Sequence, residues 1–140
     1  MDLMLQPLRK YTDFNGRARR SEYWFFVLFV VIVQVLARVL TWFVGGDLEH
    51  DPFGSPASAI VALAYFGFCL YILIPSLAVS FRRLHDSGRT AWWLLLGLIP
   101  ILGQLVVLIF MILDGTPGDN RFGPDPKVTV PPAPDTQAAT

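Results

Sequence analysis

Two arginine-rich segments are the parts of this sequence best equipped for chemistry. One, FNGRARRSEYW, starts at Phe14, and the other, RRLHDSGR, starts at Arg82. Guanidinium groups bind phosphates and carboxylates, so both segments are candidates for contact with lipid headgroups or with a partner. The candidate residues are Arg17, Arg19, Arg20, Arg82, Arg83, His85, Asp86 and Arg89.

The adjacent pair His85 and Asp86 suggests metal binding or acid–base catalysis, but the rest of the sequence argues against both. A protein zinc site takes three or four ligands, and the only other histidine, His50, is separated from the pair by an apolar run long enough to cross a membrane. The sequence also lacks a nucleophile elbow, a phosphate-binding loop, a dinucleotide fingerprint and a zinc-protease motif. We therefore predict no metal, no cofactor and no catalytic residue.

Ion pairing offers another interpretation of the same charges. Arg82, Arg83 and Arg89 would keep this loop in the cytoplasm and meet phosphate headgroups, while Asp86 pairs with an arginine and residues 87–88 make the turn. The turn can also receive the amino-terminal segment, so that Glu22 and Asp86 neutralise arginines of the other segment. We favour such a structural cluster over catalysis.

Three polar residues, Gln34, Arg38 and Gln104, lie within long apolar runs. Gln34 and Arg38 are four residues apart and so share one face of a helix. Polar groups inside a membrane are functional candidates by default. However, Arg38 is near enough to the end of its run to reach the outer headgroups, and amides commonly hydrogen-bond neighbouring helices. We favour packing over a transport path.

The segment GTPGDNRFGPDP, which starts at Gly115, is built from turn-forming residues. Its carboxylates resemble ligands for a hard cation such as calcium, but their spacing does not match an EF-hand loop. We predict an ordered cap over residues 114–127, held by bonds from side chains to the backbone.

Long apolar runs must position these segments. The chain has 140 residues and is 54% apolar and 16% charged, whereas about a quarter of a soluble domain is charged. Residues 23–44, 57–81 and 91–113 together hold 70 residues with one charge, and each run is long enough to cross about 30 Å of hydrocarbon as a helix. Neither the alternation of a membrane β-strand nor the polar stripe of a soluble helix appears. We predict an all-α membrane protein, a three-helix transmembrane bundle with short polar loops.

Charge predicts the orientation of these spans. Residues 1–22 and 82–90 together carry a net charge of +4, whereas residues 45–56 and the tail after Leu113 sum to −5. The positive-inside rule therefore places the N-terminus in the cytoplasm, and three crossings place the C-terminus outside. In the alternative, the third run bends at LIPILG, re-enters and returns to the side from which it came. Its 23 residues are too few for two full crossings.

The predicted division of the chain is a basic cytoplasmic segment over residues 1–22, a membrane domain over 23–113, the cap over 114–127 and a disordered tail over 128–140. Residues 3–11 mix apolar and basic side chains and suit the inner membrane surface, although Pro7 disfavours a long helix. Cys69 is the single cysteine, which excludes a disulfide within one chain.

The order of the polar motifs resembles a known family. FNGRARRSEYW, RRLHDSGRTAWW and GTPGDNRFGPDP flank the apolar runs in a pattern similar to domain-of-unknown-function family 805, the YhaH-like small bacterial inner-membrane proteins. The resemblance covers about residues 8–127. It implies a multi-spanning protein of the bacterial plasma membrane and supplies no activity or catalytic residue to transfer.

We expect a non-catalytic membrane component whose basic cytoplasmic face binds lipids, chiefly anionic ones, or a protein. A homo-oligomer or another membrane protein is a candidate partner, and nucleic acid is not. The alternative is a subunit of a small oligomeric transporter or channel, based on Gln34, Arg38 and Gln104. Such a subunit would have to oligomerise because three helices enclose little space.

Overall fold

The computed structural model describes residues 2–127. Its elements are α1 (Asp2–Arg9), α2 (Arg20–Phe43), α3 (Pro56–Asp86), the 3₁₀-helix η1 (Ala91–Leu98) and α4 (Leu102–Ile112). Over the described residues the only β-type pairing is two isolated bridges, between Asp47 and Asp51 and between Asn120 and Gly123. The predicted all-α class is confirmed. The predicted disordered tail, residues 128–140, lies outside the described residues.

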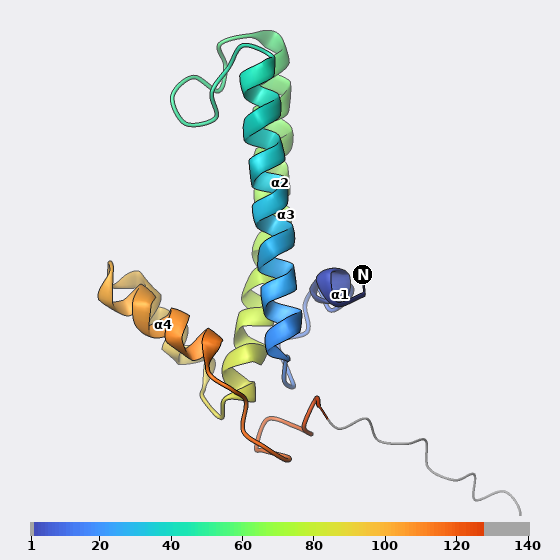
Figure 1. The fold of residues 1–140 in the computed structure, drawn as a ribbon, viewed down its shortest axis with the longest axis vertical. Helices are drawn as coiled ribbons and strands as arrows, with labels where there is room; N and C mark the ends of the chain where they lie inside the picture. Colours follow the sequence, from blue (N-terminus) through green and yellow to red (C-terminus); the bar gives the residue numbers. More distant parts are fainter. Residues whose placement is uncertain (1, 128–140) are drawn as a thin grey trace, which may run out of the picture.

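Helices α2 and α3 lie side by side and antiparallel along the long axis of the molecule (Figure 1). They have 24 and 31 residues and are both long and apolar enough to cross a membrane. A capping box starts α3: Ser55 and Ser58 each accept a hydrogen bond from the other's backbone N–H. Pro56 follows at the first helical position, where an N–H would have no helical partner. The first two predicted spans correspond to α2 and α3, although α3 continues to Asp86.

The third apolar run differs from the predicted span over residues 91–113. It is divided into η1 and α4, and the chain reverses between them, where Ile101 has a φ of 65°. A Cβ at position 103 would lie 1.7 Å from the carbonyl oxygen of Leu96, so only glycine allows the two halves to approach this closely. With 11 residues, α4 is only about 16 Å long and cannot cross the hydrocarbon alone. The prediction of a third continuous helix is therefore wrong, and the backbone follows the re-entrant alternative.

The η1–α4 hairpin and α1 lie on opposite sides of the α2–α3 pair, towards the same end (Figure 1). α1 packs through Leu8 against a buried cluster of Ala18, Phe26, Ile72 and Val79. Beyond α1, the hydroxyl of Tyr11 donates to the carbonyl of Tyr71 at 2.7 Å. The amino-terminal segment is thus fastened across the two long helices.

Residues 114–127 return to the end of the helix pair at which α2 begins. Arg20 Nη2 lies 3.0 Å from Asp114 Oδ1, and the backbone N–H of Thr116 donates to the carbonyl of Asp86 at 2.8 Å. The sequence predicted these residues on the opposite side of the membrane from the N-terminus. In the structure both segments lie at the same end of the helix pair, because the third run doubles back between η1 and α4.

Candidate functional site

Asp86, the last residue of α3, is the centre of a buried ion-pair network. Its Oδ1 accepts a hydrogen bond from Arg17 Nε at 2.9 Å, and its Oδ2 accepts one from Arg83 Nη1 at 2.6 Å. These three side chains are at most 1% exposed. Arg82 Nη1 donates to Glu22 Oε1 at 2.7 Å, and this pair is also buried. Glu22 and Asp86 thus neutralise arginines of the other segment, as the structural interpretation of the sequence expected.

Backbone carbonyl groups complete the surroundings of two of these arginines. Arg17 donates through Nη1 and Nη2 to the chain that follows the hairpin, and Arg83 donates through Nε and Nη2 to the end of α4 and to the residue directly after it. The accepting oxygens belong to Met111, Leu113, Thr116 and Gly118. Buried charges are tolerated only when such partners replace water. Arg17 therefore holds the cap in place and Arg83 holds the end of α4, and neither is free to bind a lipid headgroup.

The cap also contacts the end of α3 directly. Asn120 Nδ2 donates to the carbonyl of His85 at 3.0 Å, and the imidazole ring stacks on Phe122 with centroids 4.1 Å apart. A Cβ at position 115 would lie 2.1 Å from Asp86 Oδ2, so Gly115 is required for this approach. His85 thus packs against the cap, and within residues 2–127 no group of three metal-ligating side chains forms.

Asp125 stabilises the turn at the end of the cap. The backbone N–H groups of Lys127 and Gly118 donate to its carboxylate at 2.9 and 3.0 Å. These bonds lower the pKa of the Asp125 carboxyl below its usual value, with the Lys127 bond contributing most. The group is therefore ionised at neutral pH, and the predicted cap has the side-chain to backbone bonds expected of it.

A polar pocket of about 260 Å³ lies beside the buried network. Its lining residues are Gln6, Lys10, Arg17, Arg19, Glu22 and Pro126. Arg19 Nε donates to the carbonyl of Pro126, which leaves its other nitrogens available. The exposed Lys10 ammonium has no partner among the described residues. The pocket therefore offers cationic donors that the fold has not used.

Lys10 and Gln6 were not singled out from the sequence. Residues 3–11 were predicted to suit the membrane surface as a whole, and Pro7 disfavoured only a long helix there. In the structure α1 is an eight-residue helix that contains Pro7. The mixture of apolar and basic side chains over residues 3–11 could have predicted a short amphipathic helix. No local sequence pattern, however, predicted the pocket.

The remaining arginine candidates lie around the network. Arg20 pairs with Asp114, with its side chain 47% exposed. The guanidinium group of Arg89 lies over the ring of Phe110, 4.2 Å from its centroid, so Arg89 packs on the hairpin.

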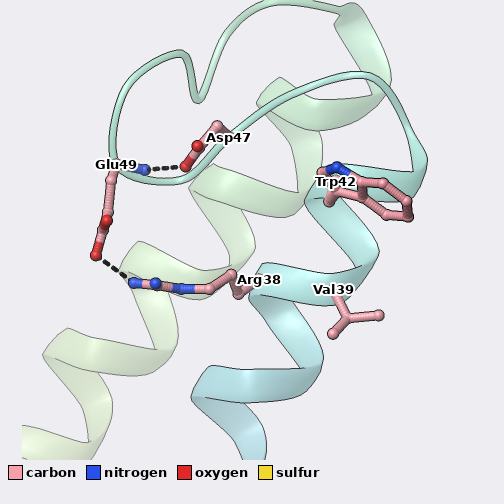
Figure 2. A pocket seen from close by; sticks show the side chains of 5 residues that line it. All are labelled: Arg38, Val39, Trp42, Asp47 and Glu49. Atoms are coloured by element: carbon pink, nitrogen blue, oxygen red, sulfur yellow. Dashed lines mark hydrogen bonds and ion pairs between the residues drawn. The ribbon is translucent and has the colours of Figure 1, made fainter.

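The other end of the helix pair contains Arg38. Its guanidinium group points toward the loop over residues 45–55 and pairs with Glu49, whose backbone N–H donates to Asp47 Oδ1 at 2.8 Å (Figure 2). This bond is the largest cause that lowers the pKa of Asp47. Arg38, Asp47 and Glu49, with Val39 and Trp42, line a pocket of about 290 Å³. Arg38 thus reaches out of the apolar run, as expected, and finds a carboxylate of its own chain.

Gln34 and Gln104 are both exposed on the surface of the helices that carry them. Neither side chain makes a hydrogen bond within the described part of the chain. Gln34 lies on α2 and Gln104 on α4, so the expected amide contacts between helices do not form within one copy. The structure does not bring the three intramembrane candidates together into a path.

Comparison with known proteins places these features in context. The family model described as "Protein of unknown function (DUF805)" matches residues 11–124. Inner membrane protein YhaH of Escherichia coli is 42% identical over 132 residues, which cover 91% of this chain and 98% of that protein. Inner membrane protein YhaI is 40% identical over 127 residues, with 91% and 97% covered. The uncharacterized protein YiiR is 30% identical over 139 residues, with 81% and 85% covered. No solved structure matches the chain.

Proposed function

Because this chain belongs to the DUF805 family, whose members YhaH and YhaI are inner membrane proteins, we propose that it is a non-catalytic inner-membrane protein that binds anionic lipid headgroups. The observation that carries this proposal is the pocket in which Lys10 and the unused nitrogens of Arg19 lie beside the buried network, with Glu22 as the single carboxylate among its lining residues.

Net charge favours an anion in this pocket. The buried network has three guanidinium groups, those of Arg17, Arg82 and Arg83, against the two carboxylates of Glu22 and Asp86. It therefore has an excess of one positive charge, and Lys10 and Arg19 add two more at the pocket. A phosphate group supplies negative charge and acceptor oxygens for both Lys10 and Arg19.

The location of the pocket favours a lipid as the source of that phosphate. Amphipathic helices beside basic residues suit the plane of the membrane interface. α1 is amphipathic, with Arg9 in its last turn and Lys10 directly after it, and it packs across α2 and α3. The basic end belongs in the cytoplasm by the positive-inside rule. On that side the anionic leaflet supplies the headgroup phosphates that this proposal requires.

The assignment of individual arginines changes accordingly. From the sequence, Arg82, Arg83 and Arg89 were expected to meet headgroups. In the structure Arg82 and Arg83 are completely buried, and Arg89 lies over Phe110. Lys10 and Arg19 take that role in this proposal. A base near an anionic leaflet contributes on the order of 1 kcal/mol.

The test compares two double variants in nanodiscs of neutral lipid. Native mass spectrometry measures the retention of added phosphatidylglycerol or cardiolipin. We expect Lys10→Gln with Arg19→Gln to weaken binding by roughly 30-fold, the effect of about 2 kcal/mol. Arg121→Gln with Lys127→Gln removes the same charge from the exposed cap and should have little effect. Equal retention by the two double variants would reject the pocket as the headgroup site.

A further inference from the structure

We infer that α2 pairs with α2 of a second copy of this chain along the face that carries Gln34. Gln34 lies well inside a 24-residue apolar helix, is exposed, and has no hydrogen-bond partner among the described residues. The proposed pairing of two α2 helices does not depend on lipid binding.

A partnerless amide at this depth is unfavourable. Hydrocarbon offers neither donors nor acceptors, so each unsatisfied polar group there costs several kcal/mol. The side of α2 that faces α3 is occupied by residues such as Phe26, which packs against Ile72 and Val79, and Glu22, which pairs with Arg82. Within residues 2–127 nothing pairs with Gln34, so we assign its partner to another chain.

The spacing of the neighbouring residues suits a helix–helix contact. Val27, Val31, Gln34 and Arg38 follow one another at intervals of four, three and four residues. This is the spacing of the seam between paired helices, in which a single polar residue specifies register and oligomeric state. The Val31 side chain is 45% exposed and is available to pack in such a seam.

A second copy fits this face better than an unrelated partner does. Copies in one membrane have the same orientation, and a two-fold axis along the membrane normal brings identical residues to the same depth. Two Gln34 amides can then bond to each other, because each supplies a donor and an acceptor. Arg38 lies one turn further along, but it pairs with Glu49 of its own chain, which reduces the repulsion between two copies.

Disulfide cross-linking in native membranes tests this arrangement. In a Cys69→Ser background, which removes the only cysteine, Val31→Cys leaves Gln34 intact and should give a cross-linked dimer on mild oxidation. Leu36→Cys is the matched control, because Leu36 is 62% exposed but lies on the far side of the helix from Gln34. It should give little dimer.

Adding Gln34→Leu to Val31→Cys should weaken the dimer by roughly three- to thirty-fold, the range expected for one hydrogen bond between membrane helices. Gln34→Asn keeps an amide and should restore part of the cross-linking. Helix content by circular dichroism should be the same in all variants, since Val31, Gln34 and Leu36 are exposed and every variant shares the Cys69→Ser background. Equal cross-linking at positions 31 and 36, no cross-linking at position 31, or no effect of Gln34→Leu would each overturn the inference.

Discussion

Burial decides what each arginine does in this protein. Arg17 and Arg83 are saturated by Asp86 and by backbone carbonyls, while Arg19 and Lys10 keep donors at an open pocket. A buried ion pair adds little stability compared with an apolar replacement, but removing one partner leaves an uncompensated charge. The network is therefore sensitive to the loss of either carboxylate.

At this scale we predict that Asp86→Asn destabilises the protein by about 3–5 kcal/mol, because two buried guanidinium groups lose their shared anion. Thermal unfolding in detergent, followed by circular dichroism, measures the change. Asp119→Asn is the matched control in the exposed cap and should change stability by less than about 0.5 kcal/mol. Similar effects of the two substitutions would show that the network is not important for stability.

At the scale of elements, the η1–α4 hairpin depends on one close approach. Gly103 faces the carbonyl of Leu96, with no room for a Cβ, whereas the nearest atom to a Cβ at Gly97 would be 4.0 Å away. The two glycines lie in the same hairpin and differ in what surrounds them.

We therefore predict that Gly103→Ala destabilises the hairpin by about 1–3 kcal/mol, because the backbone must move to admit the methyl group. Gly97→Ala should be nearly neutral. Hydrogen exchange of the hairpin amides in detergent, followed by mass spectrometry, would measure the difference. A hairpin that exchanges at the same rate in both variants would contradict the observed packing of η1 on α4.

At the scale of the whole molecule, the number of crossings sets the side on which the cap lies. The helices α2 and α3 and the reversal between η1 and α4 bring residues 114–127 beside Arg17 and Arg20. If α2 and α3 alone cross the membrane, the cap lies on the same side as the N-terminus, whereas three crossings would place it outside.

We therefore predict that a reporter fused after Lys127 is active in the cytoplasm, while one inserted in the loop over residues 45–55 is active outside. Paired fusions to alkaline phosphatase and green fluorescent protein measure both sides. An external reporter after Lys127, in a protein of normal abundance, would restore the three-span topology.

The sequence by itself determined the two long membrane helices, the basic end and the family. These properties depend on local composition: a long apolar run is a helix candidate whatever surrounds it, and a count of bases predicts orientation. The sequence also predicted that Glu22 and Asp86 pair with arginines, because a buried charge needs a partner of opposite sign.

Only the tertiary structure decided the path of the third run and the individual pairs. Apolar length cannot distinguish a helix that crosses from a chain that reverses, since both bury the same side chains in lipid. The choice depends on the approach of Gly103 to Leu96 and on the bonds that bring the cap back to α3. Arg17 and Asp86 are 69 positions apart, and no local pattern determines which arginine meets which carboxylate. That is settled by how the long helices, the hairpin and the cap pack together.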